Sequence, residues 1–241
     1  IRLSLVGSEM CIRDRVWMLQ CRSGWLFMEW QMPNKVVLLG TVAASTINFR
    51  GDLIRTLVAE GHDVYCFCTD FDDDSESIIV GMGAKPVTYR LSRAGMNPFA
   101  DLKTISILKK LLKDIKPDLV LSFFAKPVIY GTLAAALAKV PRRIAMLEGL
   151  GFVFTDQPAG PSFKTKLIRR IQVMLYRLAF RFADRVIFLN PDDPVDLIER
   201  YKIKTRNVSV LGGIGLNLAD YPYSPAPVQP VRFIFIGRLL A

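Results

Sequence analysis

The sequence predicts an α/β fold in which parallel strands form one open sheet with helices on both faces. Short runs that are apolar at nearly every position, such as 35–39 and 64–68, alternate with longer segments of helical periodicity. Such runs are typical of strands buried on both faces of a parallel sheet. Apolar residues make up 51% of the 241 residues and charged residues 22%, which allows a sizeable core. The length fits one complete domain and part of a second.

Caps, glycines and prolines mark the expected ends of the elements. Asn97 with Pro98, and Asn190 with Pro191, combine a capping side chain with a proline suited to a first helical turn. The acidic segment 70–77 is predicted to be a solvated loop, because it lacks the glycine and the closing glutamate of a calcium loop. Strands are expected at 35–39, 64–68, 86–91, 118–123, 143–147, 184–189 and 207–211. Helices are expected at 49–60, 78–82, 98–115, 127–140, 163–182 and 191–201.

The segment 41–50 is predicted to be a ligand-binding loop at the carboxyl end of the first strand. Its residues, Ser45 among them, are mostly small or polar, which lets a ligand approach the backbone, and Asn48 is expected to cap the following helix. A strand, such a loop and a crossover helix form the unit that places ligands at the switch point of an open α/β sheet. A dinucleotide fingerprint needs three glycines, of which only Gly40 is present, so an ordinary NAD or FAD enzyme is disfavoured. The alternative is a connection that binds nothing.

Glu148 and Gly149 begin a second candidate ligand loop, at the end of the fifth expected strand. Two glycines around Leu150, directly after the acidic residue, are followed by the apolar and aromatic run 152–154. This pattern predicts a pocket wall at the edge of the sheet where the strands end. A glycine turn with a solvated glutamate is the alternative.

The helix expected at 163–182 is predicted to have one packed side and one basic side. The basic side also carries apolar residues, which an anionic membrane would bury while the arginines pair with phosphate. A second protein contact, or packing within the domain, is the alternative. The predicted packed side is Leu167, Ile168, Ile171, Met174, Leu175, Leu178 and Phe182. The predicted membrane face is Lys166, Arg169, Arg170, Val173, Tyr176, Arg177, Phe180 and Arg181.

The formal net charge of +10 favours an anionic partner, and composition alone allows nucleic acid, a phosphate-bearing substrate or anionic lipid. The cysteines have no metal-ligand spacing, and no metal is expected. No bound cofactor is expected either. Four cysteines without such spacing fit a reduced, cytoplasmic protein. They are Cys11, Cys21, Cys66 and Cys68.

Both ends of the chain are expected to lie outside the main domain. Residues 1–31 have no usable periodicity, and Glu9 to Arg15 back-translate into an end sequence that transposase-based library kits attach to DNA. We therefore interpret 1–31 as a non-native leader derived from adapter, with the domain at 32–220. Four prolines in 221–230 indicate an interdomain linker. Residues 231–241 are expected to be the first strand of a truncated second domain.

Five segments of the chain form a recognisable combination. They are NFRGDLIRTLVAEGHDV, RRIAMLEGLGFVFTD, VIFLNPDD, VLGGIGLNLADY and FIFIGRLLA. Together they resemble the amino-terminal half of retaining glycosyltransferases of family four, above all bacterial enzymes that extend lipid-linked glycans. The resemblance covers 32–241 and implies a Rossmann-like acceptor domain of the GT-B fold, with the nucleotide sugar held by a second domain.

The resemblance also implies roles for individual residues. The loop 40–50, including Arg50, would face the cleft between the domains, and Arg238 would reach the donor diphosphate. Many relatives place a histidine near the transferred sugar, whereas His62, the one histidine of this chain, precedes the second strand and is expected to be structural. Glu148 stands near the position of that histidine, and its role is left open. The catalytic residues are therefore unassigned.

The function expected from the resemblance is transfer of a sugar from a nucleotide-sugar donor to a glycan acceptor linked to undecaprenyl diphosphate. The expected partners are the nucleotide sugar, the lipid-linked acceptor and an anionic membrane, without nucleic acid. The expected location is the inner face of the plasma membrane, and the chain alone is expected to be inactive. A non-catalytic α/β binding module with a basic membrane-facing helix is the alternative, and a sugar-nucleotide epimerase of the same fold is a third.

Overall fold

The fold is described from a computed structural model of the protein. The described residues are 35–91, 98–154, 160, 162–215, 217, 222, 223, 225, 233 and 235. The strands are β1 (Lys35–Leu39), β2 (Asp63–Cys68), β3 (Lys85–Thr88), β4 (Leu119–Phe123), β5 (Arg142–Leu147), β6 (Arg185–Phe188) and β7 (Val208–Val210). The helices are α1 (Ala43–Ala59), α2 (Asp73–Gly81), α3 (Pro98–Ile115), α4 (Ala125–Leu137), α5 (Phe163–Phe180) and α6 (Asp192–Pro194). The short turns η1 (Phe152–Phe154) and η2 (Val195–Glu199) follow β5 and α6.

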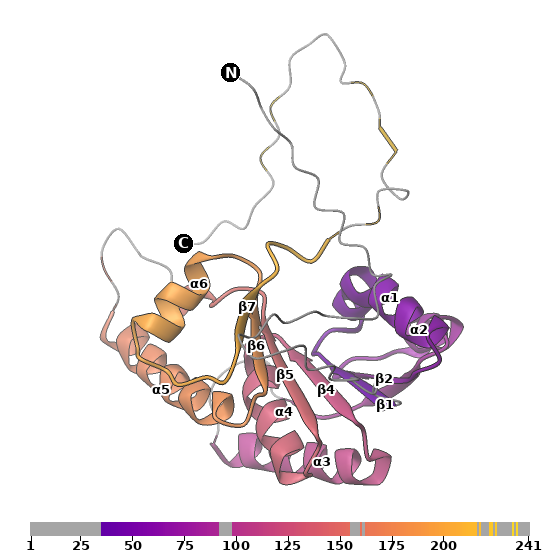
Figure 1. The fold of residues 1–241 in the computed structure, drawn as a ribbon, viewed down its shortest axis with the longest axis horizontal. Helices are drawn as coiled ribbons and strands as arrows, with labels where there is room; N and C mark the ends of the chain where they lie inside the picture. The colour runs from indigo at the N-terminus through magenta and orange to yellow at the C-terminus, as the bar shows by residue number, and fades with distance from the viewer. Residues whose placement is uncertain are drawn as a thin grey trace, which may run out of the picture. The chain divides into compact units, whose positions relative to one another are not determined.

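The strands form one parallel sheet in the order β3-β2-β1-β4-β5-β6-β7 (Figure 1). The strand order reverses between β1 and β4, which is the switch point of a doubly wound sheet. Each strand prediction is confirmed, and no strand end differs from its predicted position by more than three residues. The predicted α/β fold with an open parallel sheet is therefore confirmed.

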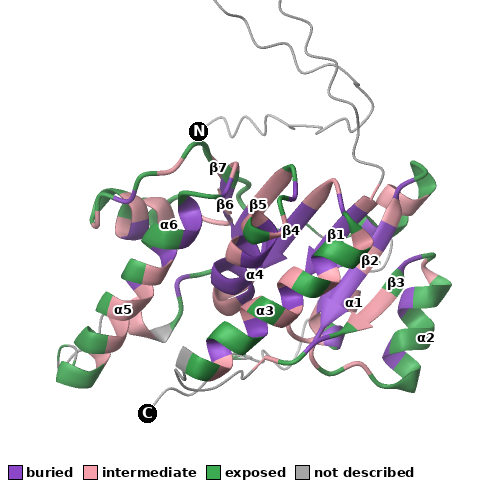
Figure 2. Ribbon diagram, turned by 90° about the horizontal axis from the view of Figure 1, so that it is seen from below, coloured by how far each residue is buried: buried purple, intermediate pink, exposed green. Residues whose placement is uncertain are grey.

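Alternate residues of the central strands pack against helices on opposite faces of the sheet. Val36 and Leu38 of β1 share a core with Ile54 of α1, and α2 contributes Ile79 to the same core. Val37 of β1 packs on the other face with Leu108 of α3. Helices α1 and α2 therefore cover one face, and α3, α4 and α5 cover the other. The central strands are accordingly buried in Figure 2.

Two helices begin earlier than the sequence predicted. The predicted ligand loop 41–50 is mostly helix, because α1 starts at Ala43, whose amide donates to Oδ1 of Asp70 at 2.9 Å. Asn48 lies inside α1, so the prediction that it caps this helix was wrong. The predicted acidic loop 70–77 contains the start of α2, where Asp72 and Ser75 form a capping box.

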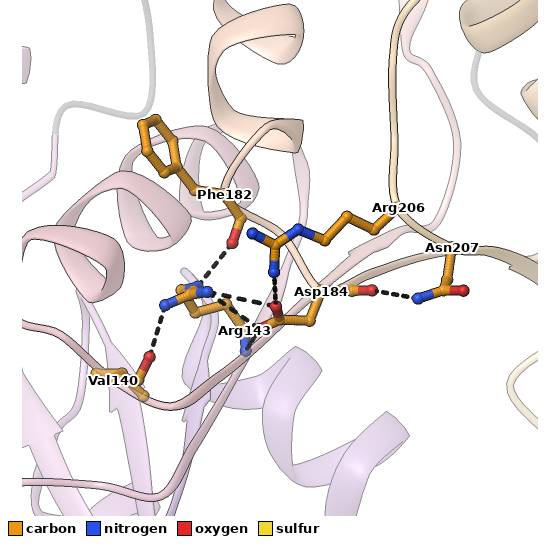
Figure 3. Close-up of polar contacts among 6 residues, drawn as sticks. All are labelled: Val140, Arg143, Phe182, Asp184, Arg206 and Asn207. Carbon is orange, nitrogen blue, oxygen red and sulfur yellow. Dashed lines mark hydrogen bonds and ion pairs between the residues drawn. The ribbon is translucent and has the colours of Figure 1, made fainter.

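Asp184 joins the starts of three strands at the amino edge of the sheet (Figure 3). Its carboxylate accepts from the amide of Arg143 in β5 at 2.9 Å and from the guanidinium of Arg206 at 2.6 Å. Its backbone carbonyl accepts from Asn207, which directly precedes β7. Asp118, which precedes β4, accepts in the same way from the amide of Lys35 in β1. This edge is therefore fixed by structural contacts, and the candidate site lies at the opposite, carboxyl edge.

Candidate functional site

The central feature of the carboxyl edge is an ion pair between Arg50 of α1 and Glu148, which directly follows β5. The guanidinium of Arg50 also donates to the carbonyl of Phe49 at 3.0 Å and to Sδ of Met146 at 3.4 Å. It lies over the ring of Phe123, 4.8 Å from its centroid. Arg50 therefore connects α1 with the ends of β4 and β5.

The two members of this pair differ in exposure. The side chain of Arg50 is 3% exposed, whereas that of Glu148 is 18% exposed. Burial raises the pKa of Glu148 and lowers the pKa of Arg50, while the ion pair opposes both changes. A buried guanidinium without a partner would cost several kcal/mol, so Glu148 is the partner that makes this position of Arg50 tolerable.

Gly40 belongs to the same cluster through close packing. A Cβ atom at this position would lie 2.4 Å from Cε2 of Phe123, the residue whose ring contacts Arg50. The carbonyl of Gly40 accepts from the hydroxyl of Tyr89 at 2.6 Å. Phe124, the residue after β4, has a φ of 69°, a backbone conformation that residues other than glycine seldom adopt. The glycine is thus required by packing at this edge.

The other residues predicted for the ligand loops lie close to this cluster along the chain. Ser45 is partly exposed and Asn48 is exposed, and both lie on α1. Gly149 follows Glu148 directly, and a Cβ atom added at Gly149 or at Gly151 would have no neighbouring atom within 4 Å. The structure therefore brings together Gly40, Arg50 and Glu148, with open space beside Gly149.

The prediction that Val173, Tyr176 and Phe180 lie on an exposed face was wrong. They are 5%, 0% and 0% exposed, and they pack against α4 and the ends of β5 and β6. Arg169 also turns inward, since its Nε donates to the carbonyl of Val153 at 2.5 Å. Apolar side chains cover two arcs of this helix, and the arc with the two large rings is the buried one. Packing within the domain, the alternative left open by the sequence, explains these apolar residues.

Part of the predicted packed side of α5 is exposed instead. Leu167, Met174 and Leu178 are 48%, 59% and 44% exposed. Together with Phe163 and Phe182 they form an apolar stripe, which we call the α5 stripe. In Figure 2, α5 is mostly green and pink, whereas α4 is largely buried. The exposed basic residues beside the stripe are Lys164, Lys166, Arg170, Arg177 and Arg181.

Sequence reasoning missed residues that support the site. Phe123 and Met146 contact Arg50, and Asp70 caps the helix that carries it. Asp70 lies two residues after the end of β2, so a polar residue near a strand end was an available signal. Arg238 lies outside the described residues. His62 is buried beside Glu60, before β2.

Two classes of feature are absent from the described part of the chain. It contains no group of three or more histidine, cysteine or acidic residues placed to hold a metal ion. No helix among residues 35–91, 98–154 and 162–215 is both long and apolar enough to cross a membrane.

Comparison with known proteins gives two relatives that act on lipid-linked sugars. The chain is 32% identical over 187 residues to the Campylobacter jejuni N,N'-diacetylbacillosaminyl-diphospho-undecaprenol alpha-1,3-N-acetylgalactosaminyltransferase, covering 78% of this chain and 48% of that protein. It is 28% identical over 149 residues to the Escherichia coli UDP-Gal:alpha-D-GlcNAc-diphosphoundecaprenol alpha-1,3-galactosyltransferase, covering 58% of this chain and 36% of that protein. The chain therefore spans about half the length of the first relative and about a third of the length of the second.

A solved structure shares the fold. Anabaena Alr3699/HepE, in complex with UDP and glucose, matches with a TM-score of 0.54 at 16% identity, over 79% of this chain and 47% of that one.

A family model described as "Glycosyl transferase 4-like" matches residues 35–190. This segment runs from β1 through β6 and includes both Arg50 and Glu148. The chain belongs to the glycosyl transferase 4-like family.

Proposed function

We propose that the protein containing this chain transfers a sugar from a nucleotide-sugar donor to a glycan acceptor linked to undecaprenyl diphosphate, in bacterial glycan synthesis. The observation that carries this proposal is the 32% identity over 187 residues to a transferase named for such an acceptor. The second relative is also named for a diphosphoundecaprenol-linked acceptor, with UDP-Gal as donor. Both names give an alpha-1,3 linkage, which supports retention of configuration because the sugar of UDP-galactose is itself alpha-linked.

The proposed reaction exchanges one bond at the anomeric carbon of the donor sugar. The bond from this carbon to the diphosphate oxygen breaks, and UDP leaves with the electron pair. The same carbon bonds to the oxygen of an acceptor hydroxyl, whose proton passes to the leaving diphosphate. Positioning of the three groups and stabilisation of the growing negative charge supply most of the rate in such a reaction. The proposal includes no metal or other bound cofactor.

The two sides of the reaction are proposed to be held by different parts of the protein. The carboxyl edge, with Gly40, Arg50, Glu148 and Gly149, faces the acceptor, and Ser45 and Asn48 border it on α1. Arg238 reaches the donor diphosphate, because a guanidinium can bridge two phosphate oxygens. The chain spans 48% of the Campylobacter relative, so we propose that it does not transfer sugar alone.

A transfer assay on the full-length protein tests this function. UDP-GalNAc or UDP-Gal is supplied with N,N'-diacetylbacillosaminyl-diphospho-undecaprenol or GlcNAc-diphospho-undecaprenol, and products are identified by mass spectrometry and by NMR of the anomeric proton. We expect an acceptor-dependent product that is one sugar longer and alpha-linked. A beta-linked product would contradict retention. Binding of UDP-sugar or acceptor without transfer in any combination would favour the non-catalytic binding module.

We also propose that the protein lies on the inner face of the plasma membrane through the α5 stripe. The stripe is apolar and exposed, basic side chains flank it, and the sequence of α5 contains no acidic residue. An anionic lipid surface buries apolar side chains and attracts nearby lysines and arginines, each by about 1 kcal/mol. The proposed membrane face is therefore the opposite side of α5 from Val173, Tyr176 and Phe180.

Sedimentation with phosphatidylglycerol vesicles at low salt tests this membrane contact. Leu167→Ser with Met174→Ser removes part of the stripe, and Lys166→Glu with Arg170→Glu reverses charge beside it. We expect both double variants to bind the vesicles less tightly than wild type. In the charge-reversal variant, the affinity is expected to fall about fivefold for each basic residue removed. The matched control is Lys103→Glu with Lys110→Glu on exposed positions of α3. Wild-type sedimentation of both stripe variants, or an equal loss in the α3 control, would contradict the proposal.

A further inference from the structure

The carboxylate of Glu148 is anchored on one side only. Its Oε1 atom pairs with the guanidinium of Arg50, and Arg50 is its only polar partner among the described residues. An ionised carboxylate offers about four lone-pair positions on two oxygens. The side chain is 18% exposed, so acceptor capacity remains on the side away from Arg50.

The anchoring group itself is held by three elements. The guanidinium of Arg50 donates to the carbonyl of Phe49 in α1, lies over the ring of Phe123 in β4 and donates to Sδ of Met146 in β5. A long arginine side chain normally loses considerable rotamer freedom when it is fixed in this way. Here the arginine side chain loses this freedom when the protein folds, before any ligand binds. Glu148 is consequently a preorganised hydrogen-bond acceptor.

The chain after Glu148 leaves room for a ligand. A Cβ atom at Gly149 or Gly151 would meet nothing within 4 Å. The position is also the carboxyl edge of a parallel sheet, where open α/β folds bind ligands. A carboxylate repels the diphosphate of either substrate, whereas it accepts hydrogen bonds from sugar hydroxyls. The chemistry therefore favours a neutral sugar ring over a phosphate group.

We propose that Glu148 binds the acceptor sugar, by accepting a hydrogen bond from one of its hydroxyl groups, and that Arg50 is the positioning residue that fixes this carboxylate. This inference rests on the proposed function and adds to it a residue that selects the acceptor. Glu148 is assigned no part in moving a proton or in the bond exchange. Arg50 acts through Glu148 and does not touch the sugar.

Steady-state kinetics of the full-length protein test the inference, with KM measured separately for acceptor and for UDP-sugar. Glu148→Gln keeps the shape of the side chain but weakens the charge-assisted hydrogen bond. We expect kcat/KM for the acceptor to fall by about 10- to 100-fold, the scale of one hydrogen bond to a charged group. The KM for UDP-sugar is expected to stay within about twofold. The matched controls are Asp52→Asn and Arg55→Met, which break an exposed ion pair on α1, the helix that carries Arg50. Neither control is expected to change the acceptor KM.

A double-mutant cycle separates positioning by Arg50 from a merely structural role. Arg50→Met is expected to raise the acceptor KM as Glu148→Gln does, and the double variant is expected to be no worse than either single variant. A structural role would add an independent loss in the double variant. Unfolding curves identify any variant that fails to fold. If Arg50→Met does not fold, the kinetics of Glu148→Gln alone test whether Glu148 contacts the sugar.

The outcomes also separate this inference from the proposed function. Transfer by the wild type with an unchanged acceptor KM in Glu148→Gln overturns the inference and leaves the function standing. A rise in the KM for UDP-sugar instead of acceptor overturns the assignment to the acceptor. Absence of transfer by the wild type overturns both.

Discussion

Tyr176 and Phe180 stack one turn apart on the buried side of α5, with ring centroids 5.3 Å apart and planes inclined by 24°. Both rings are fully buried, in the same core as Ala145 and Leu147 of β5. The pair fixes the rotation of α5 about its axis, because two large rings on one side outweigh several smaller apolar side chains on the other. The exposed α5 stripe is a consequence of this rotation.

Truncation on each side of α5 tests that rotation. Tyr176→Ala is expected to lower the free energy of unfolding by about 3–5 kcal/mol, as for other buried aromatic residues. Met174→Ala, at a position that is 59% exposed, is expected to change it by no more than about 0.5 kcal/mol. Urea unfolding of the chain measures both values. Larger destabilisation by Met174→Ala than by Tyr176→Ala would restore the face assignment made from the sequence.

Two glycines in helices are predicted to respond oppositely to alanine. A Cβ atom at Gly131 of α4 would lie 2.3 Å from Cδ2 of Leu39, so Gly131→Ala should destabilise by about 1–3 kcal/mol. A Cβ atom at Gly81 of α2 meets nothing within 4 Å, so Gly81→Ala should stabilise by about 0.5–1 kcal/mol. Thermal or urea unfolding gives the sign of each change. Stabilisation by Gly131→Ala would contradict the close approach of α4 to β1, and destabilisation by Gly81→Ala would contradict the open space at α2.

The pair between Asp63 and Lys85 predicts a pH-dependent contribution to stability. Lys85 Nζ lies 2.6 Å from Oδ1 of Asp63, and this hydrogen bond is the main cause that lowers the pKa of Asp63. A lowered pKa in the folded state means that the contribution is present above about pH 4 and is lost as the pH falls through the lowered value. The pair is well exposed, so its value at pH 7 is expected to be about 0.5 kcal/mol.

Urea midpoints of wild type and Asp63→Asn, measured between pH 7 and pH 3, test this contribution. The variant is expected to be less stable at pH 7, and the difference is expected to shrink as the pH falls below about 4. Lys85→Met should reproduce the loss at pH 7. A difference between wild type and Asp63→Asn that is the same at every pH would show that the ion pair is not its origin.

The strands were predictable from the sequence because local composition determines them. Runs such as 35–39 are apolar at nearly every position, and burial on both faces of a parallel sheet requires this. The start of α1 was not predictable locally, because the group that satisfies the Ala43 amide is Asp70, from the end of the next strand. A cap supplied by tertiary structure leaves no signal beside the helix that it caps.

The sequence predicted which residues belong to the candidate site, but it did not predict how they are arranged. Arg50 and Glu148 were both expected at strand-end loops, but they are 98 positions apart and their pairing depends on the distance between α1 and β5. Arg50 was expected in a loop facing the cleft, whereas it lies in α1 and is buried against Phe123. The packed side of α5 depended on α4 and the sheet in the same way, since apolar side chains lie on two arcs of the helix.

Sugar transfer by the full-length protein, with and without Arg238, tests the central claim most directly. We expect the wild type to extend a diphospho-undecaprenol-linked sugar with an alpha linkage, and the 241-residue chain alone to form no product. Arg238→Ala is expected to lower turnover by about 10²- to 10³-fold, the scale seen on removing one preorganised charge-stabilising group. His62→Ala, at a buried position before β2, should change stability more than turnover. Product formed by the isolated chain, or unchanged turnover in Arg238→Ala, would contradict the account.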